Sequence, residues 1–155
     1  MTIDSIDRRI LDVLLKNGRI PVVELAEQVG LSPTPCRKRI ARLEKTGVIA
    51  RYAAVIDAEQ AGYPITAFVS VELERQEAEG LALFERRVLE FEEVVQGFLM
   101  TGSQDFLLRV VVEDLHAFER FLQEKLTRIP GIRSVRSRFA LRQFVWRNRL
   151  PAASS

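Results

Sequence analysis

The hydrophobic residues of this chain follow two different periods, and the change between them lies near residue 60. Up to about residue 50, apolar side chains recur at the three- and four-residue spacing of amphipathic helices. Beyond residue 63, stretches in which apolar and polar residues alternate are separated by further helical stretches, which indicates strands and helices in turn. With 155 residues, 47% of them hydrophobic, the chain is long enough for two small domains that each have a core.

Three helices are predicted in the first part of the chain. Apolar spacing places them over residues 6–17, 21–29 and 33–45. Gly30 is expected to adopt the left-handed conformation that ends the second helix. The small Ala26 lies four residues before it, where two crossing helices must approach closely. This arrangement is typical of a helix-turn-helix unit.

The third helix combines a narrow apolar stripe with a cationic outer face. Cys36, Ile40 and Leu43 share one side of it, and the single cysteine is interpreted as a small buried hydrophobic residue. Ser32 is a suitable N-cap, and Pro33 suits the first helical position. Residues 1–50 carry nine Lys/Arg against six Asp/Glu, a net charge of +3. A basic helix alone is usually just solvated, but within a helix-turn-helix it predicts binding to double-stranded DNA.

Roles in DNA recognition follow from position along this helix. The leading end of a recognition helix reads base edges, and the long cations behind it reach phosphates. We therefore expect base contacts from Ser32, Thr34, Pro35 and Arg37, and phosphate contacts from Lys38, Arg42 and Lys45. An exchange of roles between Arg37 and Lys38 stays open. Arg51 is a further candidate, for which a solvated charge is the alternative interpretation.

The remaining chain predicts an α+β domain. After an extended connector over 51–63, strands are expected over 65–74, 94–100, 106–112 and 132–145, and helices over 80–90 and 115–126. The order βαββαβ gives a four-stranded antiparallel sheet with both helices on one face, the ferredoxin-like arrangement. The predicted boundaries are 1–50 for the helix-turn-helix domain, 64–150 for the second domain and 151–155 for a tail.

A single helical layer leaves one face of such a sheet uncovered. The second and third predicted strands along the chain, 94–100 and 106–112, are apolar in both alternating sets. One set is Phe98, Met100, Phe106, Leu108 and Val110, and the other is Val95, Leu99, Leu107 and Val111. The helices can cover only one set, so self-association is expected to cover the other. The chain is therefore predicted to form a homodimer that assembles further to a tetramer or octamer.

The stretch Val23–Ile49, VELAEQVGLSPTPCRKRIARLEKTGVI, resembles the Lrp/AsnC (feast/famine) family of bacterial and archaeal transcription regulators. The resemblance extends over nearly the whole chain, and Pro21 departs from it by standing where the family commonly has a capping Ser or Asn. The resemblance implies a winged-helix-like DNA-binding domain. It also implies sequence-specific regulation of genes for amino-acid metabolism or transport, under control of a small amino-acid effector.

The turn at residues 101–105 has two interpretations. From its composition it is a hairpin turn, with Gly102 at positive φ and Asp105 accepting backbone N–H groups. The segment TGSQDFLL also resembles the family's effector loop at a subunit interface, where Asp105 would pair with an α-ammonium group. The effector-binding residues that the resemblance implies are Leu99, Thr101, Gly102, Ser103, Gln104, Asp105, Phe139 and Ala140.

Other chemistry lacks support in the sequence. The one histidine, His116, has no ligand partner at a metal-binding spacing, and no nucleotide-binding loop or nucleophilic triad is recognisable, so neither metal nor cofactor is expected. No apolar run is long enough to cross a membrane, and a cytoplasmic location is expected. Two alternatives to an operator-binding regulator stay open: a sequence-indifferent DNA-compacting protein, and a metabolite-binding or enzymatic domain with a helical appendage.

Overall fold

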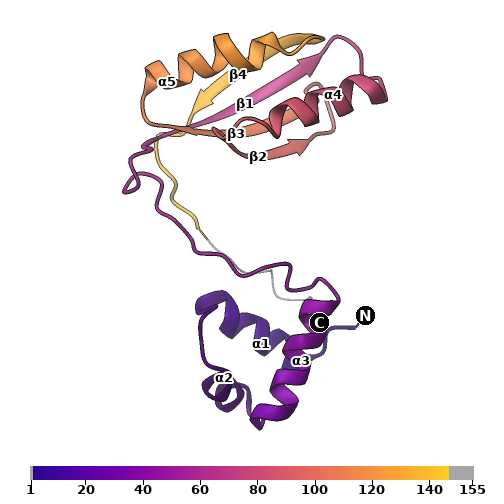
Figure 1. Ribbon diagram of the computed structural model, residues 1–155, viewed down its shortest axis with the longest axis vertical. Helices are drawn as coiled ribbons and strands as arrows, with labels where there is room; N and C mark the ends of the chain where they lie inside the picture. Colours follow the sequence, from indigo (N-terminus) through magenta and orange to yellow (C-terminus); the bar gives the residue numbers. More distant parts are fainter. Residues whose placement is uncertain (1, 147–155) are drawn as a thin grey trace. The chain divides into compact units, whose positions relative to one another are not determined.

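Three helices form the first part of the chain in the computed structural model, which describes residues 2–146 (Figure 1). They are α1 Ser5–Lys16, α2 Val22–Val29 and α3 Pro33–Lys45. Each agrees with its predicted span to within a residue at either end. The predicted helix-turn-helix order is therefore confirmed.

Local sequence explains where these helices begin and end. The N-cap Asp4 accepts a hydrogen bond from the Asp7 N–H, and Asp7 accepts one from the Asp4 N–H, which completes a capping box. Pro21 precedes α2 in an extended conformation without a side-chain cap. Gly30 has φ 73°, as predicted, and its N–H donates to the Ala26 carbonyl.

The core of the first domain is small and drawn from all three helices. Its fully or almost fully buried members are Ile10, Leu25, Ala26, Val29, Cys36 and Leu43. Ala26, predicted at the close helix crossing, and Cys36, predicted as a small buried hydrophobic residue, are both 0% exposed and lie in this core. After α3 the Ile49 N–H donates to the Leu43 carbonyl at 3.0 Å, and no strand is assigned within the described residues 46–64.

The boundary between the two domains lies at Val55 and Ile56, within the connector predicted over 51–63. Val145 and Trp146 group with the first domain rather than the second. Residues 147–150 of the predicted second domain, and the predicted tail 151–155, lie outside the described residues.

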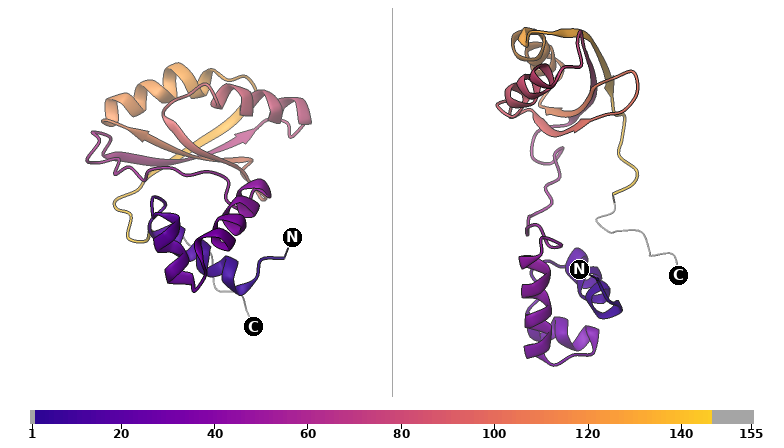
Figure 2. Two further views of the ribbon diagram at one scale, coloured as in Figure 1. Left: turned by 60° about the horizontal axis from the view of Figure 1, so that its bottom comes forward. Right: turned by 90° about the vertical axis from the view of Figure 1, so that its right-hand side faces the viewer.

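The second domain has the predicted βαββαβ order. Its strands are β1 Ile65–Leu73, β2 Val94–Leu99, β3 Phe106–Val112 and β4 Ile132–Phe139, and its helices are α4 Ala78–Val88 and α5 Leu115–Arg120. All neighbouring strands are antiparallel, in the order β2-β3-β1-β4. Both helices pack on one face of the sheet (Figure 2), which confirms the ferredoxin-like arrangement.

Two elements end earlier than their spacing predicts. β4 stops at Phe139 rather than near residue 145. In the register of β1 and β4, Ile65 stands opposite residue 141, and the preceding Pro64 has no N–H to continue the ladder, so the ladder does not reach residue 145. The Ala140 N–H makes the last contact, to the Thr66 carbonyl at 2.9 Å. α5 passes after Arg120 into π-helical and 3-10 turns that reach residue 128.

A bulge in β2 decides which side chains face the helices. The prediction grouped Phe98 with Phe106 and Leu108, and this is wrong. The register shifts between Val94 and Gln96, so Phe98 pairs with Leu107 instead. Directly paired residues point to the same face of a sheet, and one extra residue reverses the alternation.

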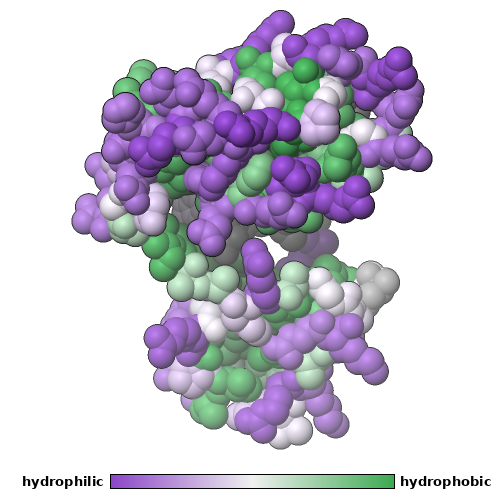
Figure 3. Space-filling view, turned by 45° about the horizontal axis from the view of Figure 1, so that its top comes forward, coloured by the Kyte–Doolittle hydropathy of each residue, from purple (hydrophilic) through white to green (hydrophobic). Residues whose placement is uncertain are grey.

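The face without helices, called here the uncovered face, is consequently mixed rather than wholly apolar. It carries Phe68, Phe98, Leu107 and Val111 together with Arg109, Arg136 and Arg138. Phe68 and Phe98 are 40% and 50% exposed. Elsewhere charged and polar residues dominate the surface of the second domain that Figure 3 shows.

Replacement of Phe84 by alanine should lower the free energy of unfolding of the second domain by about 3–5 kcal/mol, because it opens a cavity in the core. The Phe84 ring is 1% exposed and stacks on Phe106 at a centroid distance of 4.3 Å. Glu85→Ala, at the exposed neighbouring position of α4, is the matched control and should change it by less than about 0.5 kcal/mol. Urea titration followed by circular dichroism measures both, and equal effects would contradict the packing described here.

Candidate nucleic-acid interface and effector loop

The eight residues predicted to contact DNA are all solvent-exposed. Seven lie on α3 or at its start, and Arg51 follows in the connector; they are Ser32, Thr34, Pro35, Arg37, Lys38, Arg42, Lys45 and Arg51. The apolar stripe of α3 faces inward, with Cys36 and Leu43 both 0% exposed. Burial raises the pKa of the Cys36 thiol above its ordinary value, so this residue stays a neutral core residue.

The start of α3 differs from the prediction in one detail. Ser32 has the extended conformation of an N-cap, but its side chain makes no capping hydrogen bond. The reason is local, since Pro33 and Pro35 have no N–H and thereby remove donors that a cap would satisfy. The Ser32 hydroxyl is thus not used in capping, and the Cys36 N–H donates to the Ser32 carbonyl at 3.3 Å.

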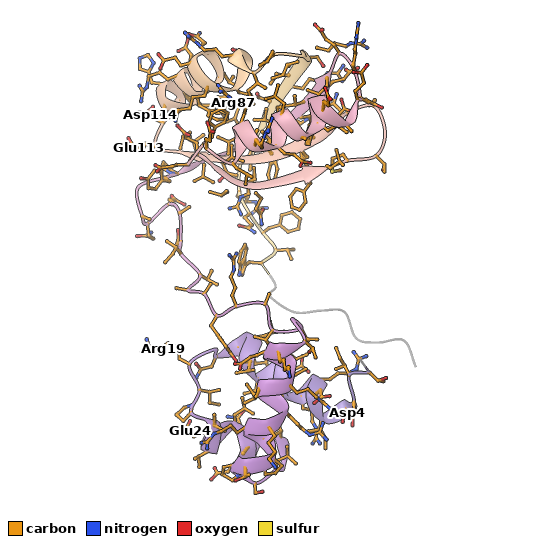
Figure 4. The ribbon with its side chains drawn as sticks, turned by 45° about the vertical axis from the view of Figure 1, so that its right-hand side comes forward. Asp4, Arg19, Glu24, Arg87, Glu113 and Asp114 are labelled. Carbon is orange, nitrogen blue, oxygen red and sulfur yellow. The ribbon has the colours of Figure 1, made fainter. Side chains whose placement is uncertain are left out.

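A cluster of four charged residues joins α3 to the start of α1. Arg39 donates to the Asp4 carboxylate at 2.6 Å and to the Asp7 carboxylate at 2.9 Å. Arg42 donates to the other oxygen of Asp7 at 2.5 Å. The Asp7 side chain is 0% exposed, and Figure 4 shows Asp4 beside α3. These four residues, Asp4, Asp7, Arg39 and Arg42, are called here the charge clamp.

The charge clamp was not predicted from the sequence. Its one local signal is the spacing of Asp4 and Asp7, which is that of an N-cap and its N3 partner in a capping box. The other half, Arg39 and Arg42, lies 32 residues or more further along the chain. Arg42 is consequently both an exposed candidate for phosphate contact and a partner of a buried carboxylate.

The clamp fixes the charge of Asp4. The N–H of Asp7 and the guanidinium of Arg39 hold the pKa of the Asp4 carboxyl at about 2, below its ordinary 3.8, and the contact with Asp4 raises the pKa of Arg39.

A separate contact joins the connector to α3, because the Tyr52 hydroxyl donates to Glu44 at 2.8 Å. Burial, and then Glu44, raises the pKa of Tyr52 to about 12.

In the second domain, Asp105 anchors the predicted effector loop. Its carboxylate is 5% exposed and accepts hydrogen bonds from the Leu73 N–H at 2.7 Å and the Gln76 amide at 2.6 Å. Both oxygens therefore have protein partners, and the geometry does not present Asp105 to an α-ammonium group. Gln76 was not found from sequence, since only the fold brings it to a residue 29 positions away.

The first three residues of the loop are exposed to solvent. Thr101, Gly102 and Ser103 are exposed, and Gly102 has φ 106°, which a glycine adopts without strain. The amide oxygen of Gln104 is buried and has no hydrogen-bond partner among the described residues. A buried acceptor without a donor is uncommon in folded proteins, which sets Gln104 apart from the exposed residues of the loop.

The eight predicted effector residues do not form one site within a single chain. Leu99 pairs with Phe106, whose partner on β1 is Val71, at the end of the sheet where the loop lies. Phe139 pairs with Ala67, and Ala140 bonds to the neighbouring Thr66. Val71 and Ala67 lie four residues apart on β1, so Leu99 and Phe139 are separated by about 13 Å along the strand direction.

Two hollows in this domain also lie apart from the loop. One of about 370 Å³ is lined by α4 and β2, including Leu99, and one of about 610 Å³ is lined by residues such as Tyr63, Glu93 and Arg120. Residues 100–105 line neither. The described part of the chain has no group of three His, Cys, Asp or Glu residues suited to a metal ion, and none of its helices is long and apolar enough to span a membrane.

Comparisons with known proteins agree with this two-domain architecture. The profile of a winged helix-turn-helix DNA-binding domain matches residues 3–50, and that of the Lrp/AsnC ligand binding domain matches residues 66–150. Together they define a transcription regulator in which a DNA-binding domain is joined to a ligand-binding domain. The chain belongs to the Lrp/AsnC family.

Relatives of this family match over nearly their full length. The chain is 43% identical to the Bkd operon transcriptional regulator of Pseudomonas aeruginosa over 149 residues, covering 96% of this chain and 97% of that one. It is 38% identical to the leucine-responsive regulatory protein of Escherichia coli over 148 residues, covering 96% and 90%.

Solved structures match as well. An AsnC family transcriptional regulator from Agrobacterium tumefaciens has a TM-score of 0.89 at 40% identity, with 96% of both chains covered. A transcriptional regulator from Neisseria meningitidis, solved as a complex with L-Met, has a TM-score of 0.91 at 35% identity, with 97% of both covered.

The low pKa of Asp4 predicts an acid-sensitive contribution to the stability of the first domain. A carboxylate whose pKa falls on folding stabilises the folded state above about pH 4, and this is lost as the pH falls toward about 2. Asp4→Asn keeps an oxygen for the Asp7 N–H but removes the charge that faces Arg39. Thermal unfolding from pH 7 to pH 2 should give a Tm difference from wild type that disappears at the acid end. A difference independent of pH would contradict the assignment, and Asp12→Asn on the same helix is the control.

Proposed function

We propose that this protein is a sequence-specific operator-binding regulator of genes for amino-acid metabolism or transport, and that it acts in the cytoplasm. The observation that carries the proposal is the outer face of α3, where the seven contact residues predicted on the helix or at its start are exposed. A helix with exposed cations in a helix-turn-helix domain fits the major groove, with its leading end at the bases. The relatives named above are transcription regulators, which favours this function over an enzymatic one.

Phosphate contact is proposed for Lys38, Arg42 and Lys45, and substitution tests it most directly at Lys38 and Lys45. Both are exposed and take no part in the charge clamp. Arg42→Ala would remove a partner of the buried Asp7 as well as an outward charge, so its effect on binding would include a loss of stability. The base-reading residues in this proposal are Thr34 and Arg37, assisted by Ser32 and Pro35.

Lys38→Ala and Lys45→Ala should each weaken binding to every DNA sequence and reduce the slope of log affinity against log salt by about 0.9. Arg37→Ala and Thr34→Ala should instead change which sequences are preferred. Fluorescence anisotropy at several salt concentrations, with duplexes selected from a random library by the wild type, measures both effects. Lys16→Ala, which removes an exposed cation from α1, is the control. Equal affinity of the wild type for selected and scrambled duplexes would favour the DNA-compacting alternative.

We propose further that the protein is at least a dimer through the uncovered face and assembles to a tetramer or octamer. Exposed Phe68 and Phe98, together with half-buried Leu107 and Val111, supply the apolar contact. Arg109 and Arg138 flank Phe68 in the register, and Arg109 lies on the inner strand β3. The interface would therefore contain charged groups among its aromatic ones. Pairing the chains would pair the α3 helices, as a two-fold symmetric operator requires.

The effector in this proposal is a small amino acid held between subunits. Support comes from the match to a ligand binding domain and from the L-Met complex of the Neisseria relative. The loop 101–104 of one chain would supply polar contacts, and Phe139 and Ala140 of a second chain would supply an apolar wall. In this arrangement Asp105 stabilises the loop from the interior of the domain, because its carboxylate accepts hydrogen bonds from Leu73 and Gln76.

This arrangement can be tested by complementation between subunits. A thermal-shift screen of the twenty amino acids first identifies an effector for the wild type. Ser103→Trp and Ala140→Trp each obstruct one half of the site, and each variant alone should lose the shift. Refolding the two together should restore binding at about one site in four, the share that random pairing gives. No recovery would place both halves in one chain, and no shift with the wild type would leave the loop as a turn only.

A further inference from the structure

The charge clamp places a buried carboxylate in a domain whose core is otherwise built from hydrophobic residues. Asp7 is 0% exposed, and its two oxygens accept from two different arginines of α3. An ionised carboxylate in such a place is costly unless it is paired and hydrogen-bonded. Ile10 of α1 and Leu43 of α3 already belong to one buried apolar cluster, so the charges call for a further explanation.

The two arginines are held differently. Arg39 bonds to both Asp4 and Asp7, and its side chain is 26% exposed. Arg42 bonds to Asp7 through Nη2, and its side chain is 45% exposed. A guanidinium has five N–H donors in a planar fork, so Arg42 can keep its contact with Asp7 while other donors face outward.

Arg42 also has the right place on the helix for contact with DNA. It follows Lys38 by four residues and precedes Lys45 by three, and such spacings lie on one helix face. An arginine on that face would ordinarily sample many rotamers and lose this freedom on binding. The contact with Asp7 fixes the guanidinium before DNA arrives, which reduces that loss.

We propose that Asp7 is a positioning residue for DNA recognition. Arg39 holds the Asp7 carboxylate in place, and Asp7 orients the Arg42 guanidinium. As a result, α3 presents a fixed guanidinium to one backbone phosphate of the operator. This inference rests on the operator binding proposed above. Asp7 itself does not touch DNA. Its negative charge lowers the attraction to the phosphates of every duplex alike. The preference for the operator comes instead from the fixed direction of the Arg42 guanidinium, which only a phosphate in the matching position can meet.

Asp7→Asn tests the proposal in the full chain. Affinities are measured, over a range of salt, for a duplex selected by the wild type from a random library and for its scrambled version. The ratio of the two affinities should fall about tenfold, the effect of one lost charge-assisted hydrogen bond. Binding to the scrambled duplex should be unchanged or tighter, because a negative charge has been removed. Asp12→Asn makes the same charge change at an exposed position of α1 and should leave the ratio unaltered.

A second variant keeps the test valid if Asp7→Asn fails to fold. Arg42→Lys retains the cation but not the planar fork, so it should lower the affinity ratio while the salt slope stays within about 0.2 of wild type. A purely structural clamp would reduce the affinity for both duplexes equally and leave the ratio unchanged, which would overturn the inference. A wild type without preference between the duplexes would overturn the operator-binding proposal and this inference with it.

Discussion

The recognition helix of this protein depends on a buried carboxylate. Asp7 and its neighbour Asp4 begin α1 by capping it, and the same two carboxylates bind Arg39 and Arg42 of α3. A small domain with few core residues gains from such a contact, because ion pairs impose a direction that apolar packing does not. The start of one helix thereby sets the orientation of another, and with it the face that is offered to DNA.

The second domain is governed by a different constraint, a sheet with helices on one face only. The bulge between Val94 and Gln96 turns Phe98 outward and Leu99 inward, and this leaves the uncovered face both aromatic and basic. The same sheet separates the loop at 101–105 from Phe139 by four residues of β1. One geometry therefore underlies both proposals for this domain, the dimer and the effector site shared between chains.

Much of the fold could be predicted because its signals are local. The helical spacing of residues 5–45, Gly30 after α2 and the alternation along β1 each depend on neighbours within a few positions. The predictions that were wrong or incomplete involve partners distant in sequence. Phe98 was assigned to the wrong face because an alternating pattern does not reveal a bulge. β4 was predicted too long because its length depends on the distant strand β1, which begins only after Pro64.

The sequence alone determined the two-domain architecture, the exposed basic face of α3 and the family to which the chain belongs. Periodicity and capping act over one or two helical turns, so they can be followed along the chain. Only the tertiary structure decided what Asp7 and Asp105 do. No role was predicted for Asp7, and Asp105 was predicted as a turn residue or an effector ligand. Both are buried acceptors, because residues about thirty positions away supply their hydrogen-bond donors.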